Sequence, residues 1–178
     1  IIWDKDFIEN LHDIYESINY NTHLLPDSHL VLLDKVVVYN SCIMNFTGSI
    51  PARIIETQQP ADMGFFQNFD SSEAHNAINL DFSPDTLLLF IASVGSFNYG
   101  HWLVEDAPRL AAALLLANRY PGQTIALIII SHNDVIDRVR ELSARRILGN
   151  PKWGGFIFIK GNTFYQISKL YYMTHVTA

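Results

Sequence analysis

Cysteine is almost absent from this 178-residue sequence, in which Cys42 is the one example. A single thiol forms no internal disulfide and supplies no cysteine cluster for a metal, so disulfide scaffolds and zinc fingers are excluded. Long apolar runs are also missing, because the two longest, Leu87–Val94 and Ile125–Ile130, are far shorter than the roughly 20 residues that a membrane-spanning helix needs. The charged residues near the start do not resemble a signal peptide. We therefore expect a cytoplasmic protein that associates with membranes at most peripherally.

Positive charge is scarce as well. The chain has 12 Lys and Arg against 18 Asp and Glu, which gives a formal net charge of −6. General nucleic-acid binding needs clustered Lys and Arg, so the composition excludes it. Charged residues make up only 17% of the chain and hydrophobic residues 49%, so the sequence is able to bury a sizeable core.

Several catalytic signatures are missing too. The seven histidines show neither H-x-x-x-H nor H-E-x-x-H spacing, and we expect no metal and no other cofactor. No G-x-S-x-G or G-x-G-x-x-G motif is present, which leaves hydrolases and dinucleotide dehydrogenases without support. Gly95 and Gly100 match the start of a phosphate-binding loop, but His101 and Trp102 follow in place of Lys and Ser or Thr. A P-loop NTPase is therefore excluded.

The first part of the chain predicts a helix followed by antiparallel strands. Apolar residues at helical spacing predict an amphipathic helix over 4–18, with Asp4 as its N-cap. Runs of β-forming residues then predict an antiparallel meander; these runs are 30–33, 35–46 and 50–56. Residues 57–84 are rich in turn formers and predict loops, with one short helix near 72–77. We assign residues 1–84 to this N-terminal helix and β-rich portion.

From Asp85 onward, strands alternate with helices. The near-continuous apolar runs predict strands that are buried on both faces; they are Thr86–Val94, Thr124–Ile130, Gly155–Ile159 and a further strand near Lys169–Met173. Helices are expected at about 101–118 and 134–148. Such alternation is typical of βαβ units with a parallel sheet. We therefore predict an α/β protein in which residues 85–178 form a Rossmann-like, mainly parallel sheet, in one compact unit with the β-rich portion.

The loop after the first of these strands holds the candidate chemistry, since ligands bind outside the carboxyl ends of parallel strands. His101, Glu105 and Arg109 follow it at intervals of four residues, which places them on one face of a continuous helix. Pro108 interrupts such a helix and makes the alignment of Arg109 the least secure. An imidazole beside a carboxylate is an acid–base arrangement. Spacing alone also fits an ordinary surface ion pair with a capping histidine, and this alternative stays open.

These assignments carry geometric expectations. The His101 side chain should be partly accessible and lie within about 3.5 Å of a carboxylate or a backbone carbonyl, with Glu105 one turn below it. Four large apolar side chains of the same helix should turn inward: Trp102, Leu103, Leu110 and Leu114. After the second buried strand, Ser131–Asn133 supply caps for the helix at 134–148, which Gly149 ends. His132 and Asp134 stand where a cleft is expected, and we interpret them as helix-capping residues.

The segment Asn98–Leu110 resembles the N-Y-x-H-W-L-x-[DE]-x-x-P-R-L signature of glycosyltransferase family 61. That family includes bacterial capsule and exopolysaccharide transferases, and plant and animal enzymes that add xylose, arabinose or N-acetylglucosamine. The surrounding order of elements is similar over roughly residues 30–178. The resemblance implies an inverting, metal-independent transferase in polysaccharide biosynthesis, which moves a hexose or pentose from a nucleotide-sugar donor to a hydroxyl of a glycan acceptor.

The resemblance also implies which residues act. His101 is the expected base for the acceptor hydroxyl, with Glu105 orienting it. The reverse assignment, with Glu105 or Asp106 as base and His101 on phosphate, remains open. The expected substrate- or diphosphate-binding residues are Asn98, Tyr99, Gly100 and Arg109.

Family members have two Rossmann-like domains that face a cleft, the architecture called GT-B. Motifs of their second half mark much of the donor site, and nothing resembling them appears in this sequence. We therefore expect the donor-binding domain to lie outside this chain, and the isolated chain to lack activity. Two other classes stay open: a non-catalytic sugar- or nucleotide-binding α/β module, and a structural subunit that pairs with another chain.

Overall fold

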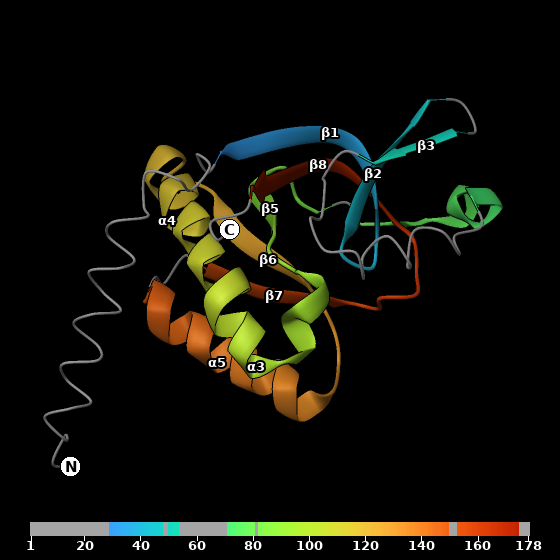
Figure 1. The fold of residues 1–178 in the computed structure, drawn as a ribbon. Coiled ribbons are helices and arrows are strands. Elements are labelled where there is room, and N and C mark those ends of the chain that lie inside the picture. Colours follow the sequence, from blue (N-terminus) through green and yellow to red (C-terminus); the bar gives the residue numbers. More distant parts are fainter. Residues whose placement is uncertain (1–28, 48–49, 54–70, 81, 150–152, 175–178) are drawn as a thin grey trace, which may run out of the picture.

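The computed structural model describes residues 29–47, 50–53, 71–80, 82–149 and 153–174. The helix predicted over 4–18 and most of the predicted loops lie outside these ranges. Within them the protein is a mixed α/β structure built on one eight-stranded sheet (Figure 1). None of the helices in these ranges has the length and apolar character needed to cross a membrane.

Three parallel strands form one side of this sheet. They are β5 (Thr86–Phe90), β6 (Thr124–Ile130) and β7 (Trp153–Ile159), paired in that order. The predicted parallel arrangement is therefore confirmed. Five consecutive residues of β6, from Ile125 to Ile129, are buried, because neighbours pack on both faces of the strand, as its continuous apolar run indicates.

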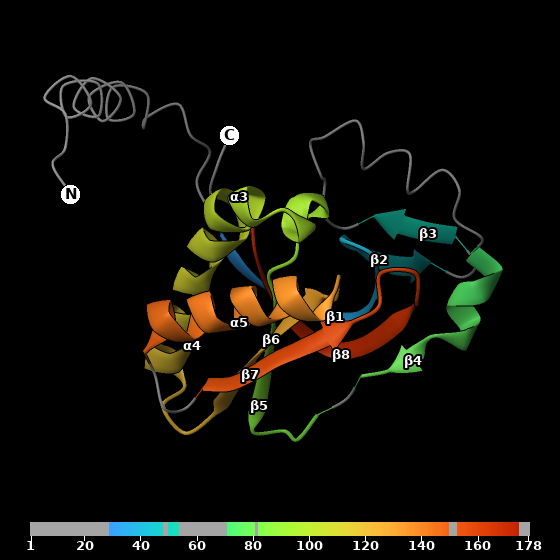
Figure 2. The ribbon, with the colours of Figure 1, turned by 90° about the horizontal axis from the view of Figure 1, so that it is seen from below.

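Two crossover helices join these strands and lie together on one face of the sheet, as Figures 1 and 2 show. They are α4 (Leu110–Arg119) and α5 (Asp134–Leu148). The bounds of α5 agree with the predicted helix. Asn133 caps its first turn by accepting from the N–H groups of Val135 and Ile136, and Gly149 ends it in a left-handed conformation. The cap predicted within Ser131–Asn133 is confirmed at Asn133, whereas the side chains of His132 and Asp134, also interpreted as capping residues, do not cap the helix.

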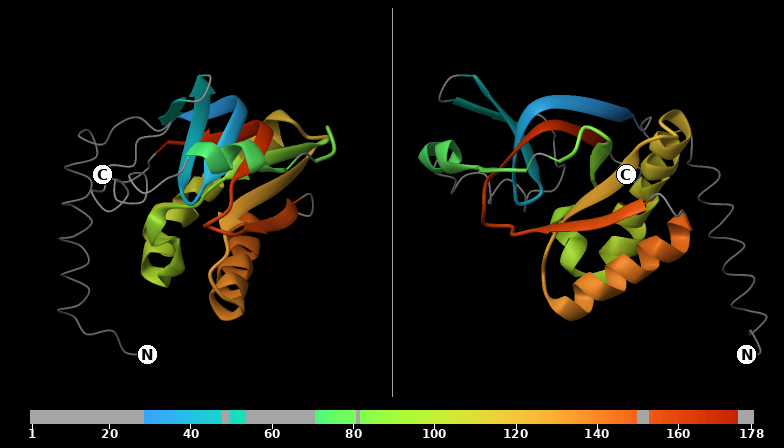
Figure 3. Two further views of the ribbon diagram at one scale, coloured as in Figure 1. Left: turned by 90° about the vertical axis from the view of Figure 1, so that its right-hand side faces the viewer. Right: turned by 180° about the vertical axis from the view of Figure 1, so that it is seen from behind.

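The β-rich portion is an antiparallel meander, as predicted, of β1 (Leu30–Tyr39), β2 (Cys42–Thr47) and β3 (Ile50–Arg53). The prediction of a break at residue 34 and of one strand over 35–46 was wrong, because β1 continues to Tyr39 and the turn lies at Asn40 and Ser41. The meander forms the other end of the same sheet, away from the helices (Figure 3). The short helix predicted near 72–77 is a 3₁₀ helix over Ser71–Asn76, and β4 (Ile78–Asn79) follows it.

The last strand, β8 (Tyr165–Met173), joins the meander to the parallel strands. It pairs with β1 antiparallel over most of its length and with β5 parallel only at Leu89 and Phe90. The full order is β3-β2-β1-β8-β5-β6-β7, with β4 beside β8. Residues 160–164 connect β7 to β8 without a helix. The mixed α/β class is thus confirmed, and two strand–helix–strand connections, β5–α4–β6 and β6–α5–β7, join the parallel strands.

A single buried apolar cluster unites the two predicted portions. It contains Val36, Val38 and Ile43 of the meander together with residues of β5–β7, α4, α5 and β8. The sheet and this core both continue across the predicted boundary between residues 84 and 85. The site described next lies where the parallel strands end.

Candidate acid–base site

Strand β5 ends at Phe90, four residues earlier than predicted, and the chain turns into an irregular loop. The carbonyls of Ile91 and Ala92 accept hydrogen bonds from the buried Arg109 guanidinium, at 3.5 Å and 3.3 Å. A 3₁₀ turn over Val94–Phe97 follows. Helix α3 (Tyr99–His101) then begins, capped by the Asn98 side chain, which accepts from the Gly100 N–H at 2.8 Å. His101 therefore stands at the carboxyl edge of the sheet.

His101 and Glu105 form the expected contact. His101 Nδ1 lies 2.5 Å from Glu105 Oε1, and the two side chains are 47% and 19% exposed. The geometric prediction for His101 is confirmed. Because Glu105 engages Nδ1, Nε2 is the ring nitrogen left for another partner, and the ring is held in one orientation.

Gly95 makes room for the His101 ring. A methyl group built on Gly95 would lie 2.7 Å from His101 Cγ and 2.9 Å from its Nδ1, closer than real contacts between carbon atoms. The imidazole thus rests directly on the backbone of the loop. Glycine at position 95 and glutamate at position 105 together define where the ring lies.

The helix after His101 is not continuous. Trp102–Asp106 form a π-helical turn, in which the Ala107 N–H bonds to the Trp102 carbonyl, and a 3₁₀ turn over Ala107–Arg109 follows at Pro108. A π turn spaces its hydrogen bonds one residue further apart than an α turn, and a 3₁₀ turn one residue closer. The alignment expected for eight residues of α-helix is therefore lost. The prediction that Arg109 shares a face with His101 and Glu105 was wrong.

Arg109 points into the protein, where it is 1% exposed. Besides the two loop carbonyls, it lies 3.6 Å from Asp106 Oδ1 and 5.5 Å from the centre of the Tyr172 ring. These contacts tie the loop to α4 and β8. The guanidinium is thus covered by protein groups and is not presented at the surface beside His101.

Asp106 is also fully buried. Ser96 Oγ donates to its Oδ2 at 2.5 Å. Burial raises the pKa of the Asp106 carboxyl from 3.8 to about 6, although the Ser96 hydrogen bond and the Arg109 charge both lower it. Asp106 therefore anchors the loop from inside the protein. It does not face solvent beside His101, which is where a catalytic base would have to lie.

The other predicted residues of the motif lie at the surface or in the core. Asn98, Tyr99 and Gly100 are exposed, and Asn98 is occupied in capping α3. Trp102 is fully buried, as predicted, and its Nε1 donates to Ser143 Oγ at 2.8 Å. Leu110 is buried as well. Leu103 and Leu114 are 45% and 41% exposed, so the prediction that both turn inward was wrong.

Sequence reasoning missed a second buried arginine, Arg140 of α5. Its guanidinium donates to the carbonyls of Ser96 at 3.1 Å and Ile130 at 2.9 Å, and it pairs with Asp137. Asp137 in turn accepts from Ser131 Oγ at 2.6 Å. The available signal was the helical spacing, which places Asp137 and Arg140 in the buried stripe of α5.

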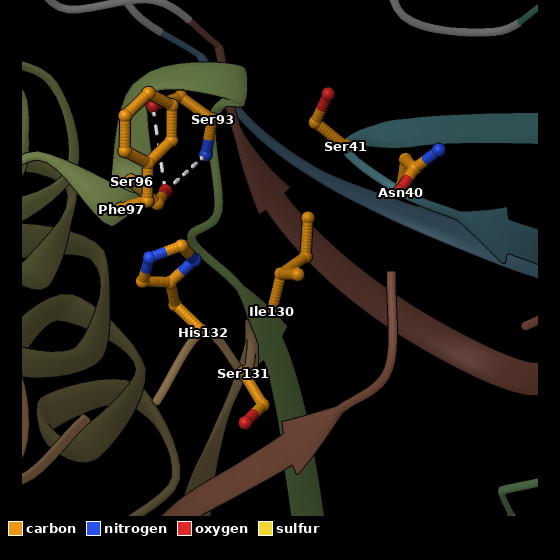
Figure 4. Close-up of a pocket in the computed structure, with 8 residues that line it drawn as sticks. All are labelled: Asn40, Ser41, Ser93, Ser96, Phe97, Ile130, Ser131 and His132. Atoms are coloured by element: carbon orange, nitrogen blue, oxygen red, sulfur yellow. Dashed lines mark hydrogen bonds between the residues drawn. The ribbon is translucent and has the colours of Figure 1, made fainter. Parts of the chain in front are cut away.

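A cavity of about 120 Å³ lies beside the same loop, between the ends of β5 and β6 and the β1–β2 turn (Figure 4). The loop contributes Ser93, Ser96 and Phe97 to its lining. The remaining lining residues are Asn40, Ser41, Ile130, Ser131 and His132. Within the described ranges, no group of three or more His, Cys, Asp or Glu side chains is arranged to hold a metal ion.

Comparison with known proteins adds no relative: no family model, no curated protein and no solved structure matches this chain. The geometry defines an α/β protein with an exposed imidazole–carboxylate pair at the carboxyl edge of its parallel strands. Such a pair is able to accept and return a proton from a ligand bound at that edge.

Proposed function

We propose that this chain supplies the acid–base half of an inverting glycosyltransferase of the GT-B type. The donor is a nucleotide-sugar and the acceptor is a hydroxyl of a glycan. The observation that carries the proposal is the His101–Glu105 contact of 2.5 Å at a half-exposed ring, inside a segment that resembles the family 61 signature.

The chemistry requires a base at this position. In an inverting transfer the acceptor oxygen forms a bond to the anomeric carbon while the bond to the nucleoside diphosphate breaks. The acceptor hydroxyl loses its proton, and His101 Nε2 takes it while Glu105 stabilises the resulting imidazolium through Nδ1. In the reverse assignment Glu105 is the base and His101 contacts phosphate. Asp106 takes neither role here because it is buried.

The structural context supports the same proposal. Ligands of α/β proteins bind at the carboxyl ends of parallel strands, and His101 stands at that edge of β5. Both buried arginines and Asp106 hold the loop that carries Gly95, so the imidazole is fixed in advance of binding. Fixed geometry of this kind is what an acid–base residue requires.

A transfer assay tests the proposal on the full-length protein, in which this chain is joined to the donor-binding domain expected outside it, because the chain alone is not expected to be active. A panel of nucleotide-sugars is incubated with oligosaccharide acceptors, and release of nucleoside diphosphate is followed together with the mass of the glycan. We expect one donor to give an acceptor that is heavier by one sugar, and Glu105→Gln to slow this transfer by about 10²-fold. Glu141→Gln, on the outer side of α5, is the matched control. No transfer with any donor contradicts the proposal.

A non-catalytic sugar-binding module is the second candidate, and the polar cavity beside the loop is the observation that favours it. Calorimetry with the same nucleotide-sugars and oligosaccharides separates the two functions. A binding module gives a measurable affinity and no product, whereas a transferase converts the donor and loses this conversion in Glu105→Gln.

A further inference from the structure

The cavity beside the candidate loop has the size of a small ligand. Its volume of about 120 Å³ corresponds to about four water molecules at the density of the liquid, which is the scale of one small polar molecule. Figure 4 shows Phe97 and His132 on one side of the cavity and Asn40 and Ser41 on the other. Neither His101 nor Glu105 is among the residues that line it, so it is separate from the acid–base pair.

The polar groups of the lining fall into two sets. Ser96 and Ser131 donate to the buried carboxylates of Asp106 and Asp137 and are occupied, and Ser93 Oγ lies 3.4 Å from Ser96 Oγ. The side chains of Asn40, Ser41 and His132 make no hydrogen bond with the described part of the chain.

Two of the three lie at the β1–β2 turn. Ser41 is 5% exposed, and Asn40 lies beside Gly161, where an added methyl would come within 2.6 Å of Asn40 Oδ1. Their polar atoms are available to a polar molecule in the cavity.

The lining selects a neutral molecule. Among the described residues that line the cavity there is no Lys, Arg, Asp or Glu. Arg140 lies behind the wall, but its guanidinium is directed at the Ser96 and Ile130 carbonyls and at Asp137. A phosphate or carboxylate would therefore find no Lys or Arg in the lining and only the His132 imidazole as a group able to carry positive charge, which is costly at a partly buried site.

The aromatic side of the cavity indicates a sugar. The rings of Phe97 and His132 lie 5.6 Å apart, and Phe97 is 53% exposed, so an apolar ring face stands at the cavity beside hydroxyl and amide groups. A sugar ring presents apolar C–H faces together with hydroxyls that both donate and accept. We propose that this cavity binds one neutral sugar residue, through Phe97 and His132 on one side and Asn40 and Ser41 on the other.

The choice of a sugar rests on the proposed function, although binding here does not require His101 to act as a base. Saturation-transfer NMR of the protein with free glucose, galactose, N-acetylglucosamine and xylose measures the binding directly. Phe97→Ala and His132→Ala are the test variants, since both side chains are exposed and their loss leaves the core intact. Phe82→Ala and His75→Ala are the matched controls, because both are exposed and neither lines this cavity.

We expect at least one sugar to bind, and each test variant to weaken its affinity by about fivefold or more while the controls keep it. Equal binding by wild type and Phe97→Ala overturns the proposal. So does a Kd above about 10 mM for every sugar, or tighter binding of inorganic phosphate than of any sugar. If a sugar binds and the variants weaken its affinity as expected, but the protein transfers no sugar, the pocket proposal stands and the transferase proposal fails. If no free sugar binds and neither test variant changes the rate of transfer, the pocket proposal fails and the transferase proposal stands.

Discussion

The Asp106 carboxyl should make the protein less stable as the pH rises, and asparagine at this position should remove the effect. Burial raises the pKa of Asp106 from 3.8 to about 6. The Ser96 hydrogen bond and the Arg109 charge act in the opposite direction but are outweighed, because a carboxylate inside the protein loses its hydration. The folded protein therefore binds this proton more tightly than the unfolded chain does.

The sign and size follow from the two pKa values. The stabilisation by this proton is fully present below pH 3.8, the pKa of the unfolded chain, and is lost as the pH rises through about 6. The difference corresponds to about 3 kcal/mol over the whole range, of which about 2 kcal/mol falls between roughly pH 4.5 and 7.

Urea unfolding at a series of pH values measures this effect. Other groups also titrate, so the informative quantity is the free energy of unfolding of the wild type minus that of Asp106→Asn, which keeps an oxygen for Ser96 but does not titrate. This difference should fall by about 2 kcal/mol between roughly pH 4.5 and 7. Asp85→Asn, at an exposed turn, should leave the wild-type pH dependence unchanged. A difference that is constant with pH would refute the reasoning.

Two further variants test the geometry around His101 and Trp102. Gly95→Ala places a methyl 2.7 Å from His101 Cγ, which displaces the ring by roughly 1 Å and should slow sugar transfer by about 10²-fold. Gly122→Ala, whose added methyl has no atom within 4 Å, should leave the rate unchanged, and equal rates in both variants would contradict the assignment. Ser143→Ala leaves the buried Trp102 indole N–H without its acceptor and should lower the free energy of urea unfolding by about 1–3 kcal/mol; a loss below about 0.5 kcal/mol would show that this bond is unimportant.

Periodicity predicted the parallel strands and helix α5 because both have strong local signals. The apolar runs of β5 and β6 are bounded by turn formers, and Asn133 and Gly149 mark the ends of α5. The start of β8 and its pairing were not predictable in the same way. Its partner β1 lies more than 120 residues earlier in the sequence, and strand pairing at such a distance leaves no local pattern.

The site was predicted in part for a related reason. The His101–Glu105 contact depends on one turn of helix, where spacing by four residues suffices. The position of Arg109 relative to His101 depends on eight residues of helix. The π turn and Pro108 lie within these residues and change the direction in which Arg109 points. The burial of Asp106 depends on its contact with the loop, and the role of Arg140 depends on the packing of a second helix against that loop. One segment of sequence does not encode either arrangement.

The rate of sugar transfer by His101→Ala, compared with that of His75→Ala, tests the central claim most directly. With the donor and acceptor identified by the transfer panel, loss of the imidazole that Glu105 orients should reduce kcat by about 10²–10⁴-fold. The exposed His75 should be replaceable without effect. If His101→Ala retains its rate within about threefold of the wild type while the protein remains folded, His101 is not the base.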